Sequence, residues 1–225
     1  MKKAVIFDLD DTLISEDEYI RSGYSAVAGF LRDMYGWDIR MTERQLYDLY
    51  RRNPKNVFNR LLDSHDIRYK DSEIMELVGV YREHTPSVHF YPDVLPTIQA
   101  LKDQGIKLGV LTDGYAVTQR KKLTVLNGKR FFNKIIITDE LGREYWKPDP
   151  RPFIMMKEAF LANWDEIVYV GDNPEKDFFI SKEFPIMTVR IIRENSVYAE
   201  RPYREGYRET ARVQSLKDII PLVKS

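Results

Sequence analysis

Residues 4–12 read Ala-Val-Ile-Phe-Asp-Leu-Asp-Asp-Thr, a short apolar run that ends abruptly in carboxylates. Four consecutive apolar residues without alternation are typical of a strand that is buried on both faces of a parallel sheet. In an open parallel sheet, ligands bind beyond the carboxyl ends of the strands, which is where Asp8 and Asp10 would lie. If the chain stays extended, these two residues share one strand face. The stretch therefore predicts a sheet and the edge at which a site would form.

The same pattern recurs along the chain. Further apolar runs, rich in Val and Ile, occupy residues 108–111, 135–137, 167–170 and 187–192. Segments of helical length separate them, several opening on Pro or closing near Gly or Asn: 92–105, 116–128, 150–163 and 174–184. Strands that alternate with helices predict an α/β fold, here a doubly wound, Rossmann-like parallel sheet.

The interval from residue 15 to residue 91 interrupts this alternation. A helical stripe with three- and four-residue spacing is formed by Ile20, Tyr24, Val27, Leu31 and Met34. A second helix is predicted to start at residues 53–54 (Asn-Pro), and a third to span residues 74–81. We therefore expect an α/β core of residues 1–14 and 92–225, with an inserted α-helical domain of residues 15–91.

Composition excludes several classes of protein. The 225 residues include 35 Lys and Arg against 35 Asp and Glu, and this zero net charge argues against a nucleic-acid binder or a polybasic membrane binder. Without cysteine there is no disulfide, zinc-thiolate site or Cys nucleophile. No run approaches the roughly 18 apolar residues of a membrane span. We expect a cytoplasmic protein with no nucleic-acid or membrane partner.

Charged and hydroxyl side chains gather where the strands are expected to end. Carboxylates about 4 Å apart repel each other by roughly 4 kcal/mol at an effective dielectric of about 20. One lysine cannot offset several such pairs, whereas a divalent cation can, and oxygen ligands without His or Cys favour Mg²⁺. The sequence thus predicts a magnesium site where four carboxylates converge, Asp8, Asp10, Asp172 and Asp177, with the Thr112 hydroxyl and the Lys147 ammonium at the same sheet edge.

In order and spacing, these residues resemble the four motifs of the haloacid dehalogenase (HAD) superfamily of phosphohydrolases, over essentially the whole chain. The motifs would be residues 8–12 (Asp-Leu-Asp-Asp-Thr), Thr112, Lys147 in Lys-Pro-Asp-Pro, and Gly171-Asp172 followed by Asp177. One such motif is weak, but four in register are specific. An insertion directly after the first motif resembles the small cap of this superfamily, which makes residues 15–91 the cap.

The resemblance implies a role for each catalytic residue. Asp8 would be the nucleophile that forms an aspartyl-phosphate. Asp10 would protonate the leaving oxygen and then activate water. Thr112 would donate its hydroxyl to a phosphate oxygen, and Lys147 would neutralise charge on Asp8 and on the transferred phosphoryl group.

The resemblance also implies the metal ligands. Mg²⁺ would be held by the Asp8 carboxylate, the main-chain carbonyl of Asp10 and Asp172. Asp177 would steady the metal's waters or a neighbouring ligand.

These roles indicate a Mg²⁺-dependent phosphomonoester hydrolase. Its substrate would be a small phosphorylated metabolite, such as a sugar phosphate, a polyol phosphate or a nucleotide, and the chain would be a monomer or homodimer. Asp10 favours phosphate chemistry, because dehalogenases need no such acid. Two alternatives stay open: a sugar-phosphate mutase with the same motifs, and a catalytically silent binding or scaffold protein.

Two further features carry expectations. Asp113 follows Thr112 where many relatives have Asn, and we expect its side chain to face away from the phosphate, pairing with Arg120 or capping the next helix. Residues 194–212 mix Tyr, Arg and Glu and are expected to form a solvated, salt-bridged excursion before the last helix, with an oligomer contact or a substrate-facing arm as alternatives.

Overall fold

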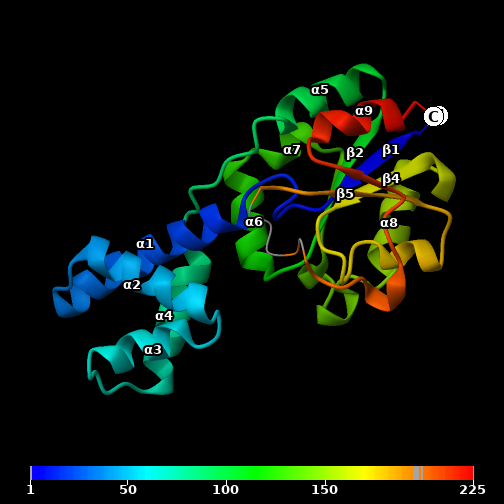
Figure 1. Ribbon diagram of the computed structural model, residues 1–225. Coiled ribbons are helices and arrows are strands. Elements are labelled where there is room, and N and C mark those ends of the chain that lie inside the picture. The colour runs from blue at the N-terminus through cyan, green and yellow to red at the C-terminus, as the bar shows by residue number, and fades with distance from the viewer. Residues whose placement is uncertain (1, 195–197, 199, 225) are drawn as a thin grey trace. The chain divides into compact units, whose positions relative to one another are not determined.

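A parallel sheet forms the core of the α/β unit in the computed structural model, which describes residues 2–194, 198 and 200–224 (Figure 1). Within these residues the strand order is β3-β2-β1-β4-β5-β6, and every pairing is parallel. The α/β prediction is confirmed, although the short last strand was not expected. The strands are β1 (Ala4–Phe7), β2 (Lys107–Thr112), β3 (Lys134–Ile137), β4 (Ile167–Gly171), β5 (Met187–Ile191) and β6 (Ala211–Val213).

Strand β1 lies in the middle of the sheet because all four of its side chains are apolar and can be buried on both faces. It pairs with β2 on one side and β4 on the other, so that Val5 lies opposite both Leu108 and Val168. Since these three strands are parallel neighbours, their carboxyl ends meet at one edge of the sheet.

Helices follow the strands as the alternation predicts. They are α5 (Val94–Asp103), α6 (Ala116–Val125), α7 (Gly128–Phe131), α8 (Arg151–Phe160) and α9 (Ile219–Leu222). The prediction of a helix over residues 174–184 is wrong. The structure has only a short 3-10 turn in this segment, at Phe179–Lys182. The side chains of Asn173 and Asp177 accept main-chain N–H groups of this segment, which competes with helix formation.

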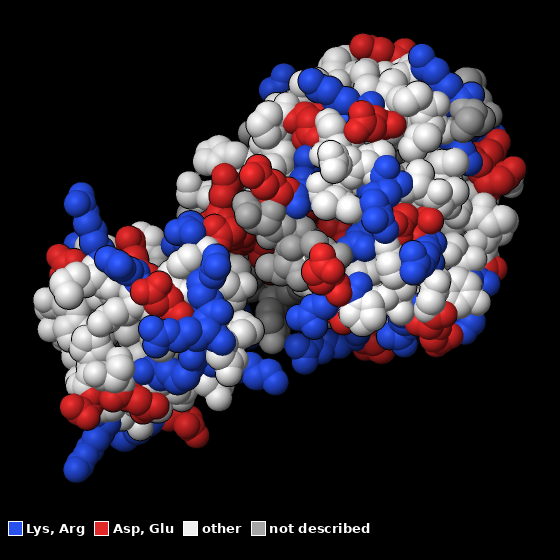
Figure 2. All heavy atoms as spheres, in the orientation of Figure 1, with Lys and Arg blue, Asp and Glu red and all other residues white. Residues whose placement is uncertain are grey.

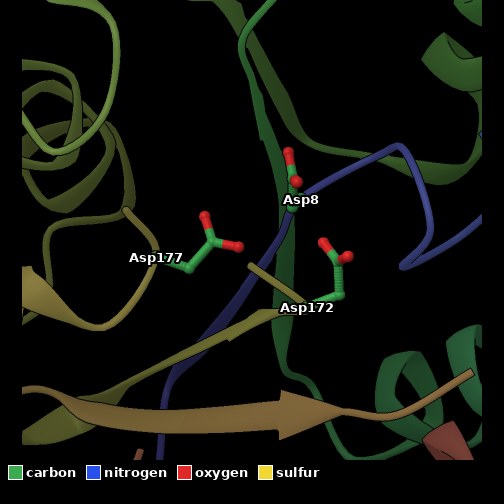
Figure 3. Close-up of side chains that lie close together, drawn as sticks. All are labelled: Asp8, Asp172 and Asp177. Carbon is green, nitrogen blue, oxygen red and sulfur yellow. The ribbon is translucent and has the colours of Figure 1, made fainter. Parts of the chain in front are cut away.

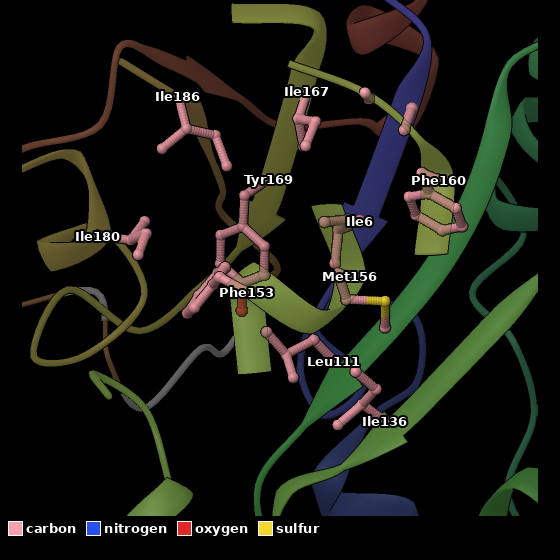
Figure 4. Close-up of a cluster of buried hydrophobic side chains, with 12 residues drawn as sticks. Ile6, Leu111, Ile136, Phe153, Met156, Phe160, Ile167, Tyr169, Ile180 and Ile186 are labelled. Atoms are coloured by element: carbon pink, nitrogen blue, oxygen red, sulfur yellow. The ribbon is translucent and has the colours of Figure 1, made fainter. Parts of the chain in front are cut away.

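Helix α8 packs against the sheet through a cluster of buried apolar side chains (Figure 4). The helix contributes Phe153, Met156 and Phe160, and the strands contribute Ile6 and Tyr169 among others. The Phe153 and Tyr169 rings meet edge to face, with centroids 4.9 Å apart. Tyr169 is fully buried, so its hydroxyl requires a hydrogen-bond partner inside the protein.

Residues Glu16–Val88 form a compact helical unit of their own, separate from the unit of Met1–Ser15 and His89–Ser225. Its helices are α1 (Glu16–Tyr35), α2 (Ile39–Arg52), α3 (Val57–Ser64) and α4 (Asp71–Glu83). The apolar stripe expected on the first helix is buried at Ile20, Tyr24, Val27 and Leu31, whereas Met34 is exposed. Helix α2 was not expected.

The start expected for the second inserted helix is wrong. Asn53 instead ends α2, where its N–H donates to the Leu49 carbonyl, and α3 begins only at Val57. The buried face of α3 carries apolar residues, Phe58 and Leu61 among them.

The two chain segments that lead into and out of the helical unit pair with each other in the α/β unit. Ile14 and Phe90 form an antiparallel bridge, and the Tyr91 N–H donates to the Leu13 carbonyl at 3.0 Å. Arg193 fixes this region from the sheet side, since its guanidinium donates to the Thr12 carbonyl at 2.7 Å.

The Tyr- and Arg-rich segment 194–212 differs from the expected solvated excursion in part. Residues 195–197 and 199 lie outside the described residues. Tyr203 accepts a hydrogen bond from the buried Arg190 at 2.8 Å and donates one to Glu209 at 3.0 Å. The segment then enters the sheet as β6. Exposed salt bridges are also present, such as Lys182 to Glu205.

Basic and acidic side chains are interspersed over the face seen in Figure 2, and Lys and Arg gather on the visible side of the helical unit. Among the described residues, no helix has both the length and the apolar character needed to cross a membrane. The charged side chains at the carboxyl edge of the sheet differ from these surface charges in that most of them are buried.

Candidate active site

The chain bends immediately after β1 and brings Asp8 to the carboxyl edge of the sheet. Asp8 donates its N–H to the Val170 carbonyl at 2.8 Å and is only 4% exposed. The Leu13 N–H then donates back to the Leu9 carbonyl at 2.8 Å, which closes a turn. The Asp8 and Asp10 carboxylates have different neighbours, and the expectation that the two residues share one strand face stays a prediction.

Three buried carboxylates converge at this edge (Figure 3). Asp8 follows β1, Asp172 follows β4 and Asp177 lies in the next loop, and one oxygen of each lies within 4.8 Å of the others. Burial raises the pKa of Asp8 to about 6, although Lys147 acts in the opposite direction. Burial and the neighbouring carboxylates Asp177 and Asp8 hold the pKa of Asp172 well above its ordinary value. The cluster therefore needs additional positive charge before all three groups can ionise.

Lys147 provides one positive charge from a fully buried side chain. Its ammonium lies 2.9 Å from Asp8 Oδ1, 2.8 Å from Asp177 Oδ1 and 2.9 Å from the Tyr169 hydroxyl. Burial alone would lower the pKa of Lys147, but Asp177 and Asp8 raise it well above its ordinary value. Because an ammonium has three N–H donors, these three contacts use them all.

Asp177 is held behind the cluster by the main chain. Its Oδ2 accepts the Asn173 N–H at 2.9 Å, while its Oδ1 faces Lys147. A Cβ at Gly171 would lie 2.5 Å from Asp177 Oδ2. Glycine is thus required at position 171 because the carboxylate approaches the backbone too closely for any side chain.

Asp10 lies in a separate set of contacts that the sequence did not predict. Lys122 donates to Asp10 Oδ1 at 2.7 Å, and the Gln119 amide donates to Oδ2 at 2.8 Å. The same amide donates to the Thr112 hydroxyl at 2.6 Å, so that Gln119 connects Thr112 with Asp10. The metal ligand expected from Asp10 is its main-chain carbonyl, and this stays a prediction.

The partners expected for Asp113 are wrong, whereas the expectation that its side chain faces away from the phosphate stays a prediction. Arg120 pairs with Glu140 at 2.6 Å, and the first N–H of α6 is taken by Asp139. Asp113 is buried instead, where its Oδ1 accepts the Lys147 N–H at 3.1 Å and its Oδ2 pairs with Lys176 at 3.1 Å.

These contacts explain how the carboxylate of Asp113 is tolerated next to Thr112. Burial would raise the pKa of Asp113, but Lys147 and Lys176 outweigh it and lower that pKa below its ordinary value. Lys176 thus adds a second ammonium near the cluster, one that the sequence did not predict.

The donor set fits a magnesium ion. Three carboxylates and no His or Cys form the cluster, and hard cations such as Mg²⁺ prefer oxygen ligands. Asp172 Oδ2 is buried without a hydrogen-bond partner, which is costly for a carboxylate unless a cation satisfies it.

No pattern in the sequence marks Gln119 and Lys122, because the apolar residues of Ala116–Val125 do not recur at helical spacing. In the structure, α6 and its C-cap residue Leu126 bury positions i, i+3, i+4 and i+7, which are Gln119, Lys122, Leu123 and Leu126. An amide and an ammonium on the buried face of a helix indicate a polar partner in the neighbouring element.

The chain resembles known proteins along most of its length. Residues 5–191 match the family model described as haloacid dehalogenase-like hydrolase. The glyceraldehyde 3-phosphate phosphatase of Methanopyrus kandleri is 33% identical over 201 residues, covering 86% of this chain and 85% of that protein. The pyrophosphatase PpaX of Bacillus thuringiensis is 25% identical over 225 residues, covering 97% of this chain and 95% of that protein.

Solved structures show the same fold. A HAD phosphatase from Thermococcus onnurineus superimposes with a TM-score of 0.62 at 25% identity, covering 99% of this chain and 98% of that chain. A 2-haloacid dehalogenase from Pseudomonas syringae gives a TM-score of 0.64 at 23% identity, covering 100% of this chain and 98% of that chain.

Proposed function

The chain belongs to the haloacid dehalogenase-like hydrolases and is a phosphatase of that family, and we propose that it hydrolyses a small phosphate monoester through an aspartyl-phosphate on Asp8. The observation that carries the proposal is the position of the Asp8 carboxylate. It stands at the end of the central strand, paired with Lys147 at 2.9 Å and beside Asp172 and Asp177. A carboxylate held between a buried ammonium and further acidic groups is suited to attack a phosphoryl group once the negative charge is balanced.

In the first step an Asp8 oxygen attacks phosphorus while the bond between phosphorus and the leaving oxygen breaks. Asp10 gives a proton to that oxygen, so the product leaves as a neutral alcohol. The Thr112 hydroxyl accepts from Gln119 and donates a long hydrogen bond to the Asp113 carbonyl at 3.3 Å, which it would exchange for a phosphoryl oxygen when substrate binds. Lys147 offsets the charge that Asp8 and the phosphoryl group bring together.

In the second step water attacks the phosphorus of the aspartyl-phosphate. Asp10, now a carboxylate, takes the water proton while the bond between phosphorus and Asp8 breaks. Inorganic phosphate leaves, and Asp8 returns to its ionised state beside Lys147.

Asp8, Asp172 and the main-chain carbonyl of Asp10 would hold Mg²⁺, with Asp177 behind them. When bound, the ion neutralises charge on the carboxylates and on the phosphoryl oxygens. The unpartnered Asp172 Oδ2 supports this assignment.

A short-chain sugar phosphate is the first substrate to test. Relatives from Methanopyrus kandleri and Methanocaldococcus jannaschii are named glyceraldehyde 3-phosphate phosphatases. We assign the helical unit, Glu16–Val88, the role of a cap that selects substrates by size. A sugar or polyol phosphate of few carbons is consistent with such selection, and nucleotides belong in the same panel.

The test is phosphate release from a panel of phosphomonoesters and from p-nitrophenyl phosphate, with Mg²⁺ or with EDTA. Activity should require the metal and fall by at least about 10³-fold in Asp8→Asn, since the amide is not a nucleophile. The exposed Asp165→Asn serves as the matched control and should retain activity.

The alternatives give different results in the same assay. A mutase would convert a sugar phosphate to its isomer with little release of inorganic phosphate. A silent scaffold would turn over nothing. Full activity in Asp8→Asn, or full activity in EDTA with no bound metal detected, would refute the mechanism.

A further inference from the structure

Helix α6 directs two buried polar side chains at Asp10. Gln119 is 1% exposed and Lys122 is 2% exposed, although both belong to residue types that usually lie at the surface. Together they occupy both oxygens of the Asp10 carboxylate, at 2.8 Å for Gln119 and 2.7 Å for Lys122. Two donors from one turn of one helix therefore fix the position of this carboxylate.

The Gln119 amide also connects Asp10 to the phosphate ligand proposed above. Its nitrogen lies 2.8 Å from Asp10 Oδ2, 2.6 Å from the Thr112 hydroxyl and 2.9 Å from the Asp113 carbonyl. Because all three neighbours are oxygens and one is a carboxylate, the NH₂ group must face them. The Gln119 Oε1 is left buried without a partner, a cost that a leucine at this position would not carry.

A packing role alone does not explain these residues. The same helical face continues with Leu123 and Leu126, and apolar residues at positions 119 and 122 would extend that apolar stripe without a desolvation cost. The Asp10 carboxylate is the acceptor that the buried ammonium of Lys122 and the buried amide of Gln119 share.

We propose that Gln119 and Lys122 are positioning residues that hold the Asp10 carboxylate beside Thr112, where it takes the proton from the water that hydrolyses the aspartyl-phosphate. Each carboxylate oxygen has two lone pairs and accepts one of these bonds. Asp10 can therefore accept a proton while both contacts persist. The inference rests on the proposed function and concerns its second step.

p-Nitrophenyl phosphate separates the two steps. The p-nitrophenolate group leaves without a proton, so the formation of the aspartyl-phosphate does not depend on Asp10, whereas its hydrolysis does. In Lys122→Met and Gln119→Leu we expect a burst of p-nitrophenolate, followed by a steady state about 10- to 100-fold slower than in the wild type. The phosphoenzyme should accumulate and be visible by mass spectrometry after an acid quench.

The kinetic constants provide a readout that loss of folding would not imitate. Slowing only the second step lowers kcat and KM together and leaves kcat/KM within about threefold of the wild type. Asp10→Asn should show the same pattern. Lys122→Arg, which keeps a cation near Asp10, should recover most of the rate. Lys129→Met, at an exposed position on α7, should change nothing.

The outcomes separate this inference from the proposed function. Wild-type kcat in both variants, or a kcat/KM that falls as far as kcat without any phosphoenzyme, would overturn the inference alone. A wild-type protein that releases no p-nitrophenolate would overturn the proposed function and this inference with it. If Lys122→Met fails to fold, Gln119→Leu decides, because it leaves no charge unpaired.

Discussion

The carboxylate cluster makes the stability of the metal-free protein depend on pH in an unusual direction. Asp8 has an ordinary pKa of 3.8, which burial raises to about 6 in the folded protein. Between these values the native state binds more protons than the unfolded state, so unfolding becomes easier as pH rises. The stabilising effect of protonated Asp8 is complete below about pH 4 and is lost as pH rises through about 6.

The size of the effect follows from the same two values. A change from 3.8 to about 6 corresponds to about 3 kcal/mol in the free energy of unfolding, at about 1.36 kcal/mol per pKa unit. For a chain of 225 residues this is about 6–12 °C in Tm. Asp172, whose pKa is also raised, acts in the same direction.

Scanning calorimetry in EDTA, from about pH 4 to about pH 7, would measure this loss and would resolve separate transitions of the two units. The amide of Asp8→Asn does not titrate, so the Tm of this variant should fall less with rising pH than the Tm of the wild type. Asp165→Asn should follow the wild type. Saturating Mg²⁺ should raise Tm more at high pH than at low pH, because its ligands must be deprotonated.

Two results would refute this reasoning. One is a metal-free wild type whose Tm, relative to Asp8→Asn, stays constant or rises between about pH 4 and pH 6. The other is an increase in Tm on addition of Mg²⁺ that is the same at about pH 4 as at about pH 6. Either would mean that Asp8 does not carry the electrostatic cost that its burial implies.

Gly171→Ala would place a methyl group 2.5 Å from Asp177 Oδ2, so we expect at least about a tenfold loss of kcat and a lower Tm; an active, equally stable variant would contradict the close approach. Arg193→Met removes the guanidinium 2.8 Å from Asp93 and leaves that carboxylate only the Leu216 N–H and the Ser215 hydroxyl, so urea unfolding should show a loss of about 3 kcal/mol, whereas a change below about 1 kcal/mol would argue that water replaces the guanidinium. Leu46→Ala opens a cavity in the core of the helical unit and should lower its stability by about 2–5 kcal/mol in urea; an unchanged midpoint would mean that the unit collapses around the missing side chain.

The sequence predicts the sheet well because its strands are buried on both faces and therefore consist of unbroken apolar residues. The run at residues 4–7 matches β1 residue for residue. Strand β6 is missed because its three residues, Ala211–Val213, include an exposed arginine and lie at the sheet edge. Helix α2 is missed although its apolar residues, Leu46, Leu49 and Tyr50 among them, recur at helical spacing, because charged and polar residues fill most of the remaining positions of Ile39–Arg52.

Proximity within the site is predictable where it follows from strand ends. Asp8 and Asp172 meet because β1 and β4 are parallel neighbours. The contacts of Asp10 with Gln119 and Lys122 span 109 and 112 residues and depend on how α6 is rotated about its axis, which no local pattern specifies. The contact of Lys176 with Asp113 is not predictable either, because an irregular loop has no repeating pattern that indicates where its side chains point.

The pairing of Ile14 with Phe90 has a consequence for engineering the inserted domain of this protein. The chain leaves the α/β unit and returns to it at adjacent points. The two segments that flank the insertion are joined there by main-chain hydrogen bonds. A turn of a few residues could join these points at a small loop-closure cost. The helical unit is thus a replaceable module: other insertions could be grafted at the same junction while the strands that carry the carboxylates keep their register.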